Sequence, residues 1–289
     1  MQKFFKSVAI FAVLVVAGMG LYRLMTQPLT QSSGNTAQRE TAFDRIKRTG
    51  TIRCGYVVWN PLLLRDANTG AMSGLAYEYM EAIAHELGFK VEWTQEVGWG
   101  DYHEALNTNK IDMMCVPVWQ SGARARVSLL TQGLYYDALV AFAREDDRRF
   151  DAGLPSLNKP DVRVVVIDGD APQSARRKLF PLSQELALPQ SADMVQQIMS
   201  VAMKKADIVL DNFDNVQRFN SGSGAKLRPV AGGQPVQIFA NVLSVRPGET
   251  DLKAALDAVI ELLNNDGTAA AIIKKYGPNF RPPAPTYLK

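Results

Sequence analysis

Residues 111–124 read IDMMCVPVWQSGAR, a mostly apolar run followed by a polar loop that ends in an arginine. A short apolar run bounded by turn residues predicts a buried strand, here residues 111–118. The residues before it follow other patterns, because 101–108 predict a helix and 90–95 predict a further strand. Strand, helix and strand in succession are typical of a parallel sheet whose faces are covered by helices.

The same alternation extends in both directions along the chain. Towards the N-terminus, residues 51–58 predict a strand and residues 74–88 an amphipathic helix that ends at a glycine. Towards the C-terminus the pattern restarts at residues 162–167, VRVVVI, a run expected to be buried on both faces. We therefore predict two α/β units, each with a doubly wound, mostly parallel sheet. They should be joined near residues 139–146 and again near 236–245.

The composition is that of a soluble globular protein. The 289 residues are 47% hydrophobic and 21% charged. Lysine and arginine number 32 against 29 acidic residues, which leaves a formal net charge of +3. This balance does not indicate the concentrated basic face of a nucleic-acid-binding protein, so we expect no nucleic-acid partner.

Residues with catalytic or metal-binding chemistry are few. Cys54 and Cys115 are the two cysteines, which excludes a disulfide-rich scaffold and a cysteine-rich zinc module. The two histidines, His85 and His103, lie on predicted helices and are expected to face solvent. The motifs Gly-x-Ser-x-Gly, His-Glu-x-x-His and Gly-x-Gly-x-x-Gly and the P-loop are absent from the sequence. We expect no catalytic residue, no metal and no cofactor.

The first 40 residues differ from the rest of the chain. Two lysines precede the uncharged stretch 7–22, and Arg23 follows it. A basic start followed by an apolar run is the pattern of a secretory signal or a membrane anchor, which we assign to residues 1–25. The polar residues 26–40 are expected to form a flexible tether. The bulk of the chain should therefore lie in the periplasm.

Retention of this segment as an inner-membrane anchor is the favoured interpretation. The uncharged stretch exceeds a typical signal core of ~7–15 residues and lacks an Ala-x-Ala cleavage site. As a helix it would span roughly 24 Å at ~1.5 Å per residue. The alternative is a signal cleaved near Gly18 or Gly20, which would leave a freely diffusing protein.

Unusual side chains follow the predicted strands. Ligands of open α/β sheets bind beyond the carboxyl ends of the strands. Trp59, Trp99 and Trp119 stand at three such ends, followed by Arg124, and Asp211 stands at a fourth. An arginine grips a carboxylate, an aspartate accepts from an ammonium group, and tryptophans cover flat or cationic groups. This set suits a small zwitterion, although tryptophans that cap hydrophobic cores and a solvated arginine would give the same pattern.

Residues 43–280 resemble the family 3 bacterial extracellular solute-binding proteins, the amino-acid-binding components of ABC transporters. Four segments in this order carry the resemblance: RIKRTGTIRCGYVVWNPLLLRDANTGAMSGLAYEYMEAIAHELG, GWGDYHEALNTNKIDMMCVPVWQSGARARVSLLTQGLYYD, KADIVLDN and ELLNNDGTAAAIIKKYG. It implies a type II periplasmic binding protein of two α/β lobes joined by two crossover strands. Lobe 1 would comprise residues 41–142 and 241–289, and lobe 2 residues 143–240.

The resemblance also implies roles for individual residues. Arg124 would bind the ligand's carboxylate, and the neighbouring Arg126 is set aside because of its spacing to the segment that follows. Trp59 and Trp99 would sandwich the ligand's side chain. Asp211 would receive its α-amino group, and two further positions would assist with backbone groups: the carbonyl of Pro117 for the amine and the N–H of Ala171 for the carboxylate.

This chain departs from the family at several of these positions. Trp119 and Asp170 stand where threonine is usual, and Leu62 replaces a common phenylalanine. With Asp168, Asp170 adds negative charge to the mouth of lobe 2, which disfavours a ligand with an acidic side chain. A neutral or basic amino acid, or a related amine-bearing compound, is therefore expected.

Cys54 and Cys115 would lie on neighbouring strands of lobe 1 in the family's strand order. Bridges between adjacent parallel strands are uncommon, so two buried thiols are the favoured expectation. A disulfide in the oxidising periplasm is the alternative.

The function implied is that of a non-enzymatic protein that captures a solute between its lobes and delivers it to an ABC permease. Two alternatives stay open. An enzyme on the same fold, similar to cyclohexadienyl dehydratase, would need an acid or base in the cleft, for which Asp170 is the candidate. A protein that senses a ligand for a membrane receptor is the other.

Overall fold

The computed structural model describes residues 40–284. The helices are α2 (Ala42–Thr49), α3 (Leu75–Leu87), α4 (Tyr102–Asn107), α5 (Gly122–Ala125), α6 (Ala171–Leu179), α7 (Met194–Ala202), α8 (Phe213–Gly222), α9 (Thr250–Asn265) and α10 (Thr268–Lys274). The strands of the main sheet are β1 (Thr51–Tyr56), β4 (Lys90–Glu96), β5 (Met113–Trp119), β6 (Leu129–Leu130), β7 (Tyr135–Arg144), β8 (Arg163–Ile167), β9 (Gln184–Leu188), β10 (Ile208–Asp211), β11 (Leu227–Pro229) and β12 (Pro235–Val245). Strands β2 (Leu64–Arg65) and β3 (Met72–Ser73) form a separate hairpin.

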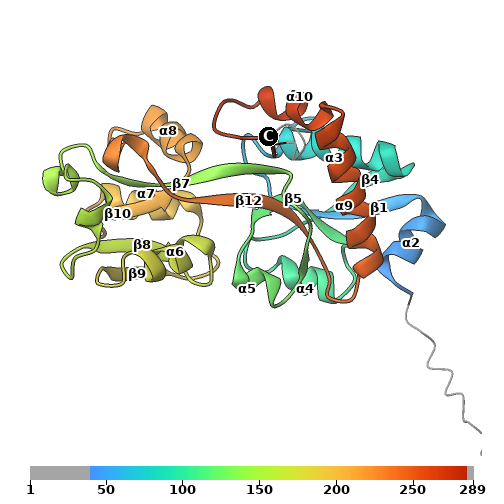
Figure 1. Ribbon diagram of the computed structural model, residues 1–289, viewed down its shortest axis with the longest axis horizontal. Coiled ribbons are helices and arrows are strands. Elements are labelled where there is room, and N and C mark those ends of the chain that lie inside the picture. Colours follow the sequence, from blue (N-terminus) through green and yellow to red (C-terminus); the bar gives the residue numbers. More distant parts are fainter. Residues whose placement is uncertain (1–39, 285–289) are drawn as a thin grey trace, which may run out of the picture. The chain divides into compact units, whose positions relative to one another are not determined.

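The main sheet has the strand order β4-β1-β5-β12-β7-β10-β8-β9. At one end β1 pairs in parallel with β4 and β5, and at the other β8 pairs in parallel with β9 and β10. Strands β7 and β12 run between the two lobes, antiparallel to their neighbours (Figure 1). The predicted α/β fold, two lobes with mostly parallel sheets joined by two crossover strands, is confirmed.

The two crossover strands also pair with each other, which the sequence did not predict. Their ladder runs from Tyr135 opposite Asn241 to Val140 opposite Pro235. The sheets of the two lobes therefore merge into one continuous sheet. The length of the strands accounts for this, because β7 has 10 residues and β12 has 11, enough to contact both lobes.

The buried apolar side chains also divide between the lobes. Two hydrophobic clusters consist of buried residues from the ranges 46–135 and 242–280. Two others consist of buried residues from the range 139–239. We keep the proposal that lobe 1 comprises residues 41–142 and 241–289, although residues 139–142 pack in the lobe 2 clusters and residues 285–289 lie outside the described residues. Lobe 2 is then residues 143–240.

The predicted helices have recognisable ends. The helix expected at 74–88 is α3, which ends at Gly88 in the left-handed conformation, φ 71°. The N–H of Gly88 donates to the carbonyl of Ala84 there, and a residue without Cβ adopts this conformation without strain. Strand β9 and helices α8 and α10 were not predicted, because their sequences are short or rich in polar residues.

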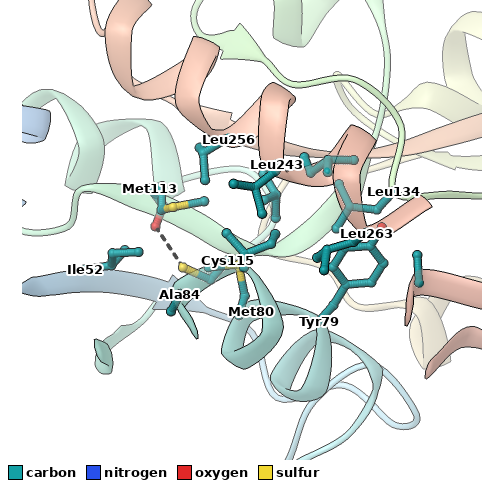
Figure 2. Packing of buried hydrophobic residues seen from close by; sticks show 14 of the residues in the cluster. Ile52, Tyr79, Met80, Ala84, Met113, Cys115, Leu134, Leu243, Leu256 and Leu263 are labelled. Carbon is teal, nitrogen blue, oxygen red and sulfur yellow. Dashed lines mark hydrogen bonds between the residues drawn. The ribbon is translucent and has the colours of Figure 1, made fainter. Parts of the chain in front are cut away.

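The expectation of two free thiols is wrong. Cys54 on β1 and Cys115 on β5 form a disulfide, and their Cα atoms lie 5.3 Å apart, within the range that a bridge requires. Parallel pairing of β1 with β5 brings the Cα atoms of the two cysteines to this separation. Both cysteines are fully buried in the lobe 1 core, among Tyr79, Met80 and Leu256 (Figure 2).

One of the bridged sulfur atoms contacts a backbone carbonyl in this core. Figure 2 marks a 3.9 Å approach of Cys115 Sγ to the carbonyl oxygen of Met113. A disulfide sulfur carries no proton, so this approach is a packing contact and not a hydrogen bond.

The proposed anchor 1–25 and most of the tether 26–40 lie outside the described residues. Within residues 40–284, no helix is both long enough and apolar enough to cross a membrane.

Candidate functional site

Trp59 follows β1 and opens a tight loop. The backbone N–H groups of Trp59 and Leu63 each donate to the other residue's carbonyl, both at 2.8 Å. The N-terminus of α3 holds the loop, because the N–H of Leu75 donates to the carbonyl of Pro61 at 3.1 Å. Gly74, with φ 118°, permits this approach, since a Cβ there would lie 2.6 Å from the loop's backbone. Trp59 is therefore positioned by the packing of α3.

Trp99 lies in the turn between β4 and α4. The N–H of Val97 donates to the carbonyl of Tyr56 at 2.8 Å, which extends the contact between β4 and β1 into this turn. The carboxylate of Asp101 accepts from the N–H of Gly98 at 2.6 Å. The turn is thus closed by its own polar groups, and Trp99 packs against a lobe 1 cluster as a half-buried side chain.

Trp119 ends β5, two residues after the buried Pro117, and contacts both crossover strands. Its indole N–H donates to Asp137 on β7 at 2.6 Å, and its ring stacks on Phe239 of β12 with centroids 5.1 Å apart. Asn241 donates to the same carboxylate oxygen of Asp137 at 3.0 Å. Burial raises the pKa of Asp137 to about 6, although these two hydrogen bonds oppose the shift.

Arg124 lies on α5, a short helix capped by Ser121, whose hydroxyl accepts from the N–H of Arg124 at 3.3 Å. The guanidinium has two partners. Its Nη1 donates to the carbonyl of Trp119 at 3.0 Å, and its Nη2 donates to Asp170 at 3.3 Å. The side chain of Arg124 is only 11% exposed, whereas Arg126 is an exposed residue.

Asp170 is the N-cap of α6 and comes from lobe 2. The strand β8 ends at Ile167, and Gly169, with φ 80°, turns the chain into the helix. Asp170 Oδ1 accepts from the N–H of Ala171 at 2.7 Å. This N–H, expected to bind a ligand's carboxylate, therefore already has an acceptor within the protein.

Asp211 ends β10 and is fully buried. Its Oδ1 accepts from the N–H of Asn212 at 2.7 Å and from the amide of Asn215 at 2.8 Å. Its Oδ2 is buried and has no hydrogen-bond partner among the described residues. Burial raises the pKa of Asp211 to about 7; the two hydrogen bonds lower it, and the nearby Asp170 and Asp137 raise it.

The raised pKa of Asp211 makes the stability of the protein depend on pH. Its carboxyl group titrates near 3.8 when unfolded and near 7 when folded. Between these values the folded state binds the proton more tightly, so ionisation of Asp211 lowers the free energy of unfolding as pH rises. The variant Asp211→Asn lacks this loss. From pH 5 to pH 8, wild type should lose about 3 kcal/mol relative to the variant, at ~1.4 kcal/mol per unit.

Urea unfolding of both proteins at the two pH values measures this difference. The exposed Asp161, changed to asparagine, serves as the control and should follow wild type at both pH values. A difference between wild type and Asp211→Asn that stays constant from pH 5 to pH 8 would contradict the raised pKa.

These side chains meet around one cavity with about 490 Å³ of empty volume. Its lining comes from both lobes: Trp59, Trp99, Pro117, Val118, Trp119, Arg124, Asp170, Met194, Asn212, Asn215 and Asn241. Six of the eight residues singled out from the sequence belong to this lining. Ala171 and Asp211 do not, although each is hydrogen-bonded to a lining residue.

The sequence did not single out five of the lining residues: Val118, Met194, Asn212, Asn215 and Asn241. Asn212 had a signal that could have found it, because it directly follows the carboxyl end of β10 and its side chain caps α8. Met194, the first residue of α7, and Asn241, in the middle of β12, enter the cavity only through the packing of the lobes.

A second hollow, of about 800 Å³, adjoins the cavity. The two share four lining residues: Trp99, Arg124, Asp170 and Met194. His103 lines the second hollow and is half-buried, so it is less exposed than the expected solvent-facing helix position. Its ring packs against Tyr102, and burial together with the charge of Arg124 lowers its pKa to about 4. His103 is therefore neutral at pH 7.

The arrangement is suited to binding. The cavity combines three indole faces, amide groups from three asparagines and one arginine paired with one aspartate. Within residues 40–284, no group of three or more His, Cys, Asp or Glu side chains is placed to hold a metal ion. Two lobes with an aromatic and polar cavity between them define a protein that can bind a small polar solute.

Comparison with known proteins agrees with this class. The family model of the bacterial extracellular solute-binding proteins, family 3, matches residues 52–279. The chain belongs to this family.

Individual relatives are distant in sequence and similar in fold. A Haemophilus influenzae protein, described as a probable amino-acid ABC transporter-binding protein, is 23% identical over 79% of this chain and 85% of its own length. An ancestral amino-acid-binding protein, a precursor of cyclohexadienyl dehydratase, has a TM-score of 0.66 at 20% identity, covering 82% of this chain and 99% of that one. A Streptococcus pneumoniae substrate-binding protein with bound L-arginine has a TM-score of 0.65 at 18% identity, covering 81% and 97%. The predicted type II periplasmic binding fold is confirmed.

Proposed function

We propose that this protein captures a neutral or basic amino acid, or a related amine-bearing solute, and delivers it to an ABC permease from the periplasm. The observation that carries the proposal is the cavity between the lobes that brings together Trp59, Trp99, Arg124 and Asp170. The relatives whose descriptions name amino acids and ABC transport support the same function.

The two charged ends of an amino acid have matching groups. Arg124 binds the carboxylate, and the N–H of Ala171 at the start of α6 assists it. The amine lies towards Asp211 and the carbonyl of Pro117. Asp211 is buried directly behind the cavity, bonded to the lining residues Asn212 and Asn215, and its Oδ2, an acceptor without a partner among the described residues, supports this assignment.

The ligand's side chain lies among the tryptophans. Trp59 and Trp99 cover its two faces, and Trp119, fixed by both crossover strands, closes a further side. Indole faces attract cationic groups and flat groups. Asp170 and Asp168 both line the adjoining hollow, and their negative charge disfavours a glutamate or aspartate ligand.

A thermal-shift screen of the common amino acids and polyamines, followed by calorimetry of those that stabilise the protein, tests this function. A ligand at ~100 times its dissociation constant adds about 2.7 kcal/mol to the free energy of unfolding. We expect neutral or basic amino acids to raise the melting temperature and acidic ones to leave it unchanged. A screen in which no amine-bearing solute binds would overturn the proposal.

We infer that the protein acts as a binding protein and not as an enzyme. The acid or base candidate, Asp170, accepts hydrogen bonds from Arg124 and from the N–H of Ala171 on the same oxygen, so it already serves as a partner of Arg124 within the protein. Incubation with prephenate or arogenate should give no aromatic product. Formation of phenylpyruvate or phenylalanine at a rate proportional to the protein concentration would contradict the inference.

We infer further that residues 1–25 tether the lobes to the inner membrane. The support is the sequence pattern of two basic residues, an uncharged stretch and Arg23. A tether of any short length would keep the lobes near a permease. Cell fractionation with N-terminal sequencing decides between tether and cleavage. A soluble form that begins between Met19 and Thr26 would overturn the tether.

A further inference from the structure

The two groups assigned to a ligand's carboxylate share an acceptor within the protein. Arg124 Nη2 donates to Asp170 Oδ1 at 3.3 Å, and the N–H of Ala171 donates to the same oxygen at 2.7 Å. Arg124 belongs to lobe 1, whereas Asp170 and Ala171 stand at the start of α6 in lobe 2. A carboxylate of the protein therefore lies between the arginine and the helix N-terminus, where the carboxylate of an amino acid would otherwise bind.

This ion pair is sheltered from water. The side chain of Arg124 is 11% exposed and that of Asp170 is 19% exposed. The other terminal nitrogen of Arg124 donates to the carbonyl of Trp119, which holds the guanidinium in the cleft. Because partly buried ion pairs are screened less than surface ones, this contact contributes to the interaction between the lobes.

We propose that Asp170 competes with the ligand's carboxylate for Arg124 and, when no ligand is bound, holds the two lobes together. The proposal rests on the proposed function only for the chemistry of the ligand. The contact between the lobes is independent of which solute binds.

The competition has a consequence for specificity. An amino acid must displace Asp170 from Arg124 before its own carboxylate can bind there, and the displaced carboxylate stays in the cleft because Asp170 lines both hollows. The two negative groups then repel each other. An amine without a carboxylate leaves the ion pair intact. Asp170 therefore lowers the preference of the protein for an amino acid over the corresponding amine.

The variant Asp170→Asn separates these effects from folding. Asparagine is as good an N-cap as aspartate, and its amide oxygen still accepts from the N–H of Ala171. The substitution removes the negative charge that faces Arg124. Asp168→Asn is the matched control, because the exposed Asp168 lines the adjoining hollow and carries the same charge, while its carboxylate accepts from Gln173 at 3.0 Å.

Calorimetry with L-arginine and with agmatine, its decarboxylated amine, measures the competition. The ratio of the two dissociation constants, agmatine over arginine, should be at least about tenfold larger for Asp170→Asn than for wild type. For Asp168→Asn it should change by about twofold at most, because Asp168 brings its negative charge to the hollow through a carboxylate bonded to Gln173 and not to Arg124. A ratio that Asp170→Asn changes by less than twofold, or that Asp168→Asn raises equally, overturns the proposal.

Small-angle X-ray scattering of the ligand-free proteins measures the contact between the lobes. Asp170→Asn should have a larger radius of gyration than wild type, and Asp168→Asn should have the wild-type value. If neither arginine nor agmatine binds any of the three proteins, that result counts against the proposed amino-acid ligand alone. The scattering then decides, and equal radii for wild type and Asp170→Asn overturn the proposal.

Discussion

Replacing Arg124 with alanine should weaken the binding of an amino acid by about 30-fold or more. Removing one member of a desolvated charged pair typically costs ~2–5 kcal/mol. The loss should be large here because Asp170 lines the same cavity. In the Arg124→Ala variant, the ligand's carboxylate would face this aspartate with no cation between them.

Isothermal titration calorimetry of wild type and Arg124→Ala with the same amino acid measures the loss. Arg126→Ala is the matched control, because Arg126 lies two residues away on the same short segment, is exposed and does not line the cavity. We expect it to bind as wild type does. Affinities of Arg124→Ala and wild type that agree within twofold would show that Arg124 does not bind the carboxylate.

Removing the disulfide should lower the free energy of unfolding by about 4 kcal/mol. Cys54 and Cys115 are separated by 61 positions in the sequence, and a bridge that closes a loop of this length restricts the unfolded chain by about this amount. The double variant Cys54→Ala/Cys115→Ala measures the loss by urea unfolding, compared with the oxidised wild type.

Wild type unfolded in the presence of a reductant is the control for packing, because it keeps both sulfur atoms in the lobe 1 core but has no bridge. Reduced wild type should account for most of the loss, and the alanine variant should lose somewhat more through the deleted sulfur atoms. A double variant within 1 kcal/mol of the oxidised wild type would show that the bridge does not stabilise the fold.

The sequence predicted the fold where its elements have a strong pattern. Apolar strands such as residues 111–118 and 162–167, and helices with glycine at their ends, correspond to β5, β8 and α3. The polar helix α8 and the short strand β9 lack such patterns. Their formation depends on packing within lobe 2, which no local pattern shows. The pairing of β7 with β12 depends on how the lobes meet, which no local pattern specifies.

The sequence could predict those site residues that come directly after the strands. Trp59, Trp119 and Arg124 could be found from their places after apolar runs. Met194 and Asn241 could not, because they enter the cavity from the start of a helix and the middle of a strand. The contact between Arg124 and Asp170, 46 positions apart and in different lobes, requires knowledge of how the lobes face each other.

The continuous ladder between β7 and β12 bears on the thermodynamics of capture. Two separate flexible links would let the lobes swing and twist in many directions, and a ligand would have to suppress all of those degrees of freedom on binding. Crossover strands that are hydrogen-bonded to each other from Tyr135 to Val140 permit far fewer relative motions. Folding therefore already removes much of the conformational entropy that closure of the lobes would otherwise cost. This favours a preorganised site and a higher affinity for the same set of contacts.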